Sequence, residues 1–216
     1  MTIPTSTAPC WAQVETLLGA LPRRAVAAFA VRAARRIASV IAQTGEHYGP
    51  EAFEWLNAVE ATLRIVEAYC RGESVSRFTL DLASDVARCA ANTMAYASQM
   101  LGLSAHAEAA ELAYAAAAFA ADCARAKTPT RAATLAVQAV RAAANGNEIT
   151  PEQQADLRIL HTQTLGDPST PTDPTEDGPM GSLWPNGEPT WSSTGREQFH
   201  KAKVAVIVLA PRSLSS

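Results

Sequence analysis

The uneven distribution of alanine constrains the fold of this chain more than any other feature of its sequence. The 216 residues include 45 alanines, which are dense up to Ala155 and then absent until Ala202. Residues 167–195 instead hold six prolines, four glycines and five acidic residues, with no Lys or Arg. Alanine favours helices, and proline interrupts helices and strands. The sequence therefore predicts a helical domain over residues 1–166, an acidic Pro/Gly/Trp tail segment over 167–195 and a short end piece over 196–216.

Apolar residues recur at helical spacing throughout the alanine-rich part, between prolines and glycines that act as helix boundaries. We expect seven helices, over residues 9–21, 23–44, 51–71, 76–101, 105–126, 130–144 and 151–165. Short connections favour an antiparallel order of neighbouring helices. The predicted fold class is all-α, an antiparallel multi-helix array of about seven helices with an irregular Pro/Gly-rich C-terminal tail.

Three segments carry more specific expectations. Residues 105–126 are apolar nearly all round and include Ala115–Ala118, which is typical of a buried central helix with Phe119 in its core. Residues 76–101 carry one apolar stripe, as on the buried side of an amphipathic helix. Its members are Phe78, Leu82, Cys89, Thr93, Tyr96 and Met100. Residues 203–210 form a β-branched run that predicts a short strand.

Composition excludes several classes of protein. The formal net charge is -3 with a pI near 5.8, which argues against a nucleic-acid-binding protein. No run of 18 uncharged apolar residues suggests a membrane span, and the first residues do not resemble a secretory signal. We therefore expect a cytoplasmic protein without nucleic-acid or membrane partners.

The cysteines and histidines do not form a recognisable site. Cys10, Cys70, Cys89 and Cys123 lie at least 19 residues apart, so no zinc-binding spacing occurs. Three of these thiols fall in apolar helical patterns, which predicts buried, inert groups, although a Cys70–Cys89 disulfide stays open. There is no nucleophile motif, no phosphate-binding loop and no HExxH. We expect no catalytic residue, no metal and no cofactor.

Two groups of residues are candidates for binding a protein partner. Arg32 and Arg35 belong to an arginine-rich helix that could bind an acidic partner, or could be a solvated face. Trp184 and Trp191 lie among turn formers and acids, and such aromatic anchors suit docking of the acidic tail. The docking surface could be the helical domain of the same chain or another protein.

A polar stripe on the helix at 76–101 is a third candidate. Asp81, Asp85, Arg88 and Asn92 share one face by their spacing. They could form a recognition stripe, part of a carboxylate site, or a solvated face with an internal Asp85–Arg88 pair.

The stretch from Ala33 to Ala126 resembles the alanine-rich immunity proteins of bacterial toxin systems. The resemblance rests on AARR at 33–36, AVEA at 58–61, EAYCRGE at 67–73 and the alanine-rich helix around 113–121. It implies an all-helical protein that binds and neutralises a cognate toxin, without catalytic residues.

These observations favour a non-enzymatic bacterial protein-binding module, such as an immunity or adaptor component of a toxin or defence system. Two alternatives stay open. One is an enzyme or small-molecule binder with a pocket between helices that uses Asp81, Asp85 and Arg88. The other is a structural homo-oligomer that buries the tail of a neighbour.

Overall fold

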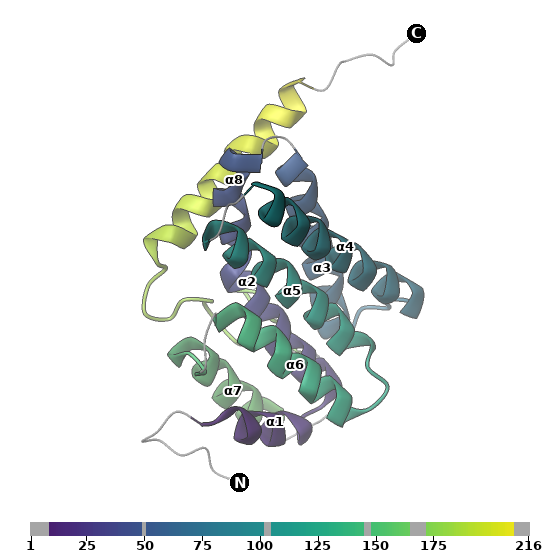
Figure 1. Cartoon of the computed structure of the whole chain (residues 1–216). Coiled ribbons are helices and arrows are strands. Elements are labelled where there is room, and N and C mark those ends of the chain that lie inside the picture. Colours follow the sequence, from purple (N-terminus) through teal and green to yellow (C-terminus); the bar gives the residue numbers. More distant parts are fainter. Residues whose placement is uncertain (1–8, 49–50, 102–104, 145–147, 165–171, 210–216) are drawn as a thin grey trace.

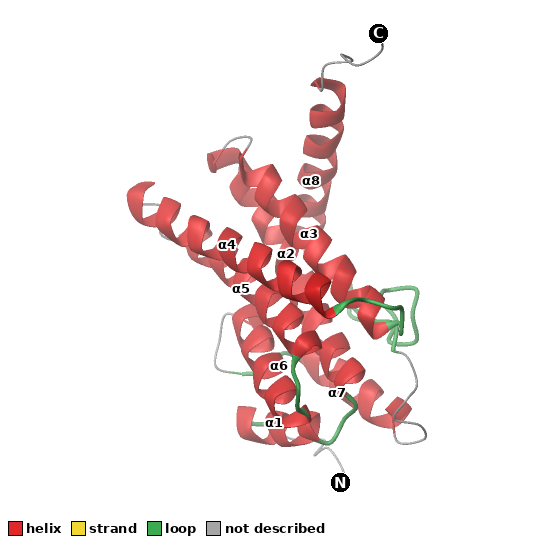
Figure 2. Ribbon diagram, turned by 90° about the vertical axis from the view of Figure 1, so that its right-hand side faces the viewer, coloured by secondary structure: helices red, strands yellow, loops and turns green. Residues whose placement is uncertain are grey.

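The chain folds into packed α-helices in a computed structural model that describes residues 9–48, 51–101, 105–144, 148–164 and 172–209. Over these residues it forms eight helices and no strand (Figures 1 and 2). They are α1 (Trp11–Gly19), α2 (Arg23–Tyr48), α3 (Glu51–Cys70), α4 (Arg77–Leu101), α5 (Ala105–Arg125), α6 (Pro129–Ala144), α7 (Pro151–Thr164) and α8 (Thr190–Leu209). The predicted all-α class and the first seven helices are confirmed.

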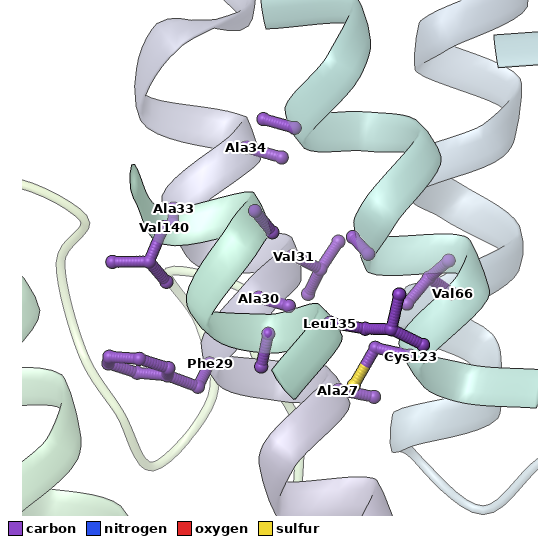
Figure 3. Packing of buried hydrophobic residues seen from close by; sticks show 14 of the residues in the cluster. Ala27, Phe29, Ala30, Val31, Ala33, Ala34, Val66, Cys123, Leu135 and Val140 are labelled. Atoms are coloured by element: carbon purple, nitrogen blue, oxygen red, sulfur yellow. The ribbon is translucent and has the colours of Figure 1, made fainter. Parts of the chain in front are cut away.

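The core is built around α2 and α5, which pack against each other and against most of the remaining helices. Every residue from 25 to 34 of α2 is buried. Nearly half of the buried apolar residues in the described part of the chain are alanines, which lets helix backbones approach closely (Figure 3). The expectation for Ala115–Ala118 of α5 is confirmed for Ala116–Ala118, which are buried, whereas Ala115 is half-buried, and α5 shares the central position with α2. Phe119 is half-buried at the edge of the core.

Local signals set several helix ends. At the start of α7, Thr150 Oγ1 accepts a hydrogen bond from Gln153 N (3.3 Å) and Gln153 Oε1 accepts one from Thr150 N (2.9 Å), which is a capping box. Gly72 ends α3 with a φ of 86°, as expected from its sequence position. The expected end of the second helix near residue 44 is wrong, because α2 continues to Tyr48.

The predicted strand over residues 203–210 is also wrong, since α8 is helical to Leu209. A lone strand in an all-helical chain has no partner for its backbone groups, whereas a helix satisfies them within the segment. This requirement outweighs the β preference of valine and isoleucine, which depends on context. None of the helices among the described residues has a stretch long and apolar enough to cross a membrane.

α8 packs against α2 and, more weakly, against α3. At the crossing point Gly195 lies so close to the carbonyl oxygen of Ser39 that a Cβ atom at this position would overlap it. The tail segment therefore leads into a helix that is part of the bundle, and its expected boundary at residue 195 falls inside α8.

Candidate functional site

The tail segment is docked on the helical domain of its own chain, and Arg32 of α2 is at the centre of the contact. The Arg32 side chain is fully buried. Its Nη1 donates to the carbonyl oxygens of Pro174 (3.0 Å) and Gly181 (2.9 Å), and its Nη2 donates to that of Ser182 (2.8 Å). Its Nε donates to Oδ1 of Asp156 in α7 (3.0 Å). One guanidinium group thus joins α2, α7 and the tail.

Arg36, one turn further along α2, extends this contact. Its Nε donates to the carbonyl oxygen of Leu183 (2.8 Å), and its Nη2 forms an ion pair with Oδ2 of Asp156 (2.6 Å). The guanidinium lies over the indole of Trp184, 6.0 Å from the ring centroid, which is within cation–π range. Trp184 meets Trp191 edge to face at 5.6 Å. The two candidate tryptophans therefore lie together, with Trp184 half-buried and Trp191 39% exposed.

The cluster of Arg32, Arg36 and Asp156 is electrostatically unbalanced, because it holds two cations and one anion. Burial raises the pKa of the Asp156 carboxyl, against the opposing effect of both guanidinium groups. Burial likewise lowers the pKa of Arg32, although Asp156 opposes that shift. Carbonyl oxygens of the tail face the excess positive charge. One of them belongs to Gly181, whose backbone φ of 66° is a conformation that glycine adopts more readily than other residues. The tail is thus bound through its backbone and Trp184 rather than through its acidic side chains.

Arg35 does not contact the tail through any hydrogen bond or ion pair in the described residues. It binds α3, where its Nε and Nη2 donate to the two carboxylate oxygens of Glu67 (2.6 and 3.0 Å) and its Nη1 donates to Glu60. Burial alone would raise the pKa of Glu60, but the ion pairs and hydrogen bonds with Arg35 and Arg64 hold that pKa below its ordinary value. Arg35 therefore holds α2 against α3.

A cleft of about 400 Å³ lies between α2, α3, the tail and α8. Its walls include the Arg35–Glu60–Glu67 cluster, the ring of Trp184 and the Glu188–Arg196 ion pair. Ser192 in the wall donates to Glu188 (2.6 Å), and among the described residues no histidine or cysteine lines the cleft beside it. The cleft has the size of a small-ligand site.

The polar stripe of α4 contributes mainly to the contact with α5. Arg88 forms an ion pair with Asp122 of α5, and Asp81 accepts from Arg125 Nη1 (2.8 Å). Asp122 is buried and also accepts hydrogen bonds from Ser84 and from Arg125 Nε (2.8 Å). These groups hold α4 against α5 and do not line the cleft.

Asp85 is exposed, and the expected Asp85–Arg88 pair is not formed in the described part of the chain. Sequence reasoning missed Asp122 and Asp156. Asp122 has a local partner in Arg125, three residues on, but its pair with Arg88 and the pairs of Asp156 with Arg32 and Arg36 join positions far apart in the sequence, which no local spacing signals.

The four cysteines are free thiols, so the open Cys70–Cys89 pairing is not formed. Cys70 and Cys123 are buried as expected, and burial raises the pKa of both thiols. Cys10 and Cys89 are exposed, so the expectation of burial is wrong for Cys89. No cluster of three or more metal-ligating side chains occurs among the described residues.

The apolar stripe of α4 faces solvent, which corrects the expectation that it packs in the core. We call it the α4 apolar face. Its large side chains are Phe78 (76% exposed), Leu82 (53%), Val86 (37%), Tyr96 (65%) and Met100 (69%). α4 instead packs on α3 and α5 through its opposite side. The buried residues of that side include three alanines and one larger residue, namely Ala83, Ala87, Ala90 and Met94. The end of α4 that leads toward α5 projects from the bundle (Figure 2).

The α4 apolar face is large for a surface patch. With accessible areas on the order of 150–200 Å² for such side chains, the five exposed fractions amount to about 450–600 Å² of largely apolar surface. This is at the upper end of what monomeric proteins leave exposed, and such patches mark interaction sites. The α4 apolar face is therefore the strongest candidate for a functional surface.

No family model matches the chain, and no curated protein or solved structure shows significant similarity to it. The resemblance to alanine-rich immunity proteins therefore stays a prediction.

Proposed function

We propose that this chain is a non-enzymatic protein-binding module that docks a helix of a partner protein on the α4 apolar face. The observation that supports this most is the exposure of five large apolar side chains along one helix. Apolar side chains spaced along a helix are a common way to bind a second amphipathic helix. The family resemblance adds a setting for this binding, an immunity or adaptor role in a bacterial toxin or defence system.

The test places a photo-crosslinking amino acid at position 78 in cells that naturally contain the chain. A crosslinked partner is expected there and not with the same amino acid at Gln138, an exposed position of α6. The partner is then purified, and Phe78→Glu is expected to weaken its binding. If position 78 yields no adduct, or if Phe78→Glu leaves the affinity unchanged, the proposed function is wrong.

The cleft supports a second candidate function, the binding of a small cationic molecule. Its lining includes Arg35 and Arg196 against five carboxylates, so it is net acidic, and Trp184 offers an aromatic wall for a cation. Titration with a diamine such as putrescine is expected to change tail tryptophan fluorescence and raise the melting temperature. Glu176→Gln, at an exposed acidic position of the wall, is expected to weaken both effects. Absence of both effects at millimolar diamine would exclude this class of ligand.

A further inference from the structure

The residues along the centre of the α4 apolar face follow the same spacing when read in either direction along the helix. Its central line consists of Phe78, Leu82, Cys89, Tyr96 and Met100, separated by four, seven, seven and four residues. All five residues are exposed. Side chains seven residues apart stay on one seam of a helix, as in coiled coils. The seam is therefore symmetric about Cys89.

Because the seam is symmetric about one residue, reversing the direction of the helix leaves its apolar residues at the same spacing. Two antiparallel copies therefore bring apolar residues opposite each other along the whole seam. We propose that a second copy of this chain covers the α4 apolar face, with the two α4 helices antiparallel and a twofold axis at Cys89. Phe78 then lies opposite the partner's Met100, and Leu82 lies opposite the partner's Tyr96. Such an interface uses the same patch on both copies, as twofold dimers require. This inference rests on the proposed function, because it names the occupant of the same face.

The charges of α4 favour the antiparallel direction. Arg77, Asp81, Asp85 and Arg88 are its charged residues, and residues 89–101 contain none. In the antiparallel pair Arg77, Asp81 and Asp85 meet the uncharged half of the other helix, and Arg88, beside the axis, is paired with Asp122 of its own α5. In a parallel pair Asp81 and Asp85 would each lie beside their own copy, and like charges at contact are destabilising.

The buried area is sufficient for a reversible dimer. Two copies of the exposed apolar surface total about 900–1,200 Å², and exposed flanking residues such as Thr93 add to it. This approaches the lower limit of roughly 1,200 Å² for specific protein interfaces. The dimer should therefore form at high protein concentration and dissociate on dilution.

The first experiment measures the mass of the full chain by light scattering across a concentration series. The wild-type chain is expected to approach the mass of two chains as concentration rises. Tyr96→Glu places a carboxylate against the partner's Leu82 and is expected to lower the association constant by roughly 30-fold or more, as for an interface hot spot. Tyr96→Phe and Gln138→Glu, on exposed positions inside and outside the face, are expected to dimerise like the wild type. Circular dichroism checks that each variant is folded.

The second experiment tests the position of the axis with a short bismaleimide in a Cys10→Ser background, in which Cys89 is the exposed thiol of the described residues. A covalent dimer is expected, and it should disappear with Cys89→Ser. With Cys89 also removed, a mixture of Asp85→Cys and Thr93→Cys chains should crosslink more than either chain alone. Stronger crosslinking within each single variant would indicate a parallel pair and overturn the register.

A wild-type chain that stays monomeric at all concentrations, or a dimer unaffected by Tyr96→Glu, would overturn the second copy as occupant. The proposed function fails separately. If the chain is monomeric and position 78 crosslinks to a different protein, this inference is wrong and the binding function stands. If the chain is monomeric and no adduct forms, both are wrong.

Discussion

At the scale of single residues, Arg32 shows how a buried cation organises the structure around it. Arginine carries five N–H donors and no acceptor, so its burial requires several acceptors in one place. Here the acceptors come from Asp156 in α7 and from three tail carbonyls. Segments more than 120 residues apart in sequence are thereby held at one point.

Replacing Arg32 with methionine should be strongly destabilising. The change leaves the Asp156 carboxylate with one cationic partner and leaves buried carbonyl oxygens unpaired, which typically costs about 3–5 kcal/mol. Urea denaturation followed by circular dichroism measures the loss. Arg158→Met, on the exposed side of α7, is the matched control and should change stability by less than about 0.5 kcal/mol. A loss below about 1 kcal/mol for Arg32→Met would contradict its anchoring role.

The pairing of Glu60 predicts a pH-dependent contribution to stability. Its pKa is held below the reference value of 4.5 in the folded chain. The folded state therefore binds fewer protons than the unfolded state near this pH, and the contribution is present above about pH 4.5 and lost as pH falls through the folded pKa. Glu60→Gln should cost about 1–3 kcal/mol at neutral pH, and the gap to wild type should narrow below pH 4.5. A constant gap in urea denaturation down to pH 3 would contradict this account.

Sequence reasoning identified Arg32, Trp184 and Trp191 as candidates because their residue types are unusual where they occur. It did not find Asp156 or Asp122, and it assigned Arg35 to a binding surface although it holds α2 against α3. Periodicity describes which residues share a face of one helix. It contains no information on which distant helix supplies the partner of a charge.

At the scale of single helices, α4 shows a second limit of periodicity. Its largest apolar side chains lie on one stripe, so the pattern predicts that this side is buried. The other side offers Ala83, Ala87 and Ala90, whose small size suits close packing against α3 and α5. A helix with two largely apolar sides is ambiguous in sequence, and only the packing of its neighbours decides which side stays exposed.

Where α8 crosses α2, the substitution Gly195→Ala should change the stability of the chain in two opposing ways. Alanine in place of glycine within a helix should gain up to about 1 kcal/mol from propensity. At position 195, however, the new methyl group overlaps the Ser39 backbone, and overpacking of this kind costs about 1–3 kcal/mol. We therefore expect net destabilisation in thermal denaturation.

Gly19→Ala in α1 is the matched control, because nothing lies within 4 Å of its would-be Cβ. This variant should be neutral or slightly stabilising. If Gly195→Ala stabilises the chain as much as Gly19→Ala does, α8 does not pack against α2 as described.

At the scale of the whole molecule, the tail and the bundle form one packed unit. The tail covers buried arginines, and α8 continues from it onto α2. Detaching the tail would break the hydrogen bonds from Arg32 and Arg36 to four tail carbonyl oxygens and separate Arg36 from the Trp184 ring. The tail should therefore unfold with the bundle rather than before it.

Tryptophan fluorescence tests this cooperativity. In a Trp11→Phe/Trp55→Phe chain the signal comes from Trp184 and Trp191, since the chain has four tryptophans. The urea midpoint of this signal should coincide with that of the helical signal in circular dichroism. A fluorescence transition at clearly lower urea would show that the tail opens separately.

The all-α class was predictable because alanine content and breaker positions act locally and agree with each other along residues 9–165. The helical conformation of residues 203–209 was not predictable, because the intrinsic preference of a β-branched run is too weak to decide between strand and helix. The described residues form no strand with which residues 203–209 could pair, and this favours the helix. Whether a partner strand exists depends on the whole fold and not on the local sequence.

The alanine contact between α2 and α5 also affects how this chain can change in evolution. A buried alanine has no side-chain rotamer entropy to lose on folding. Because its side chain is small, however, its burial contributes little free energy by itself. Of the other residue types, only glycine and serine are close to it in size; glycine lowers helix propensity and serine buries a hydroxyl group. Nearly every substitution of a buried alanine within residues 25–34 or 116–121 therefore either forces the helices apart or weakens them. Sequence drift in this protein should be confined to its outer surfaces while the alanine core stays almost fixed.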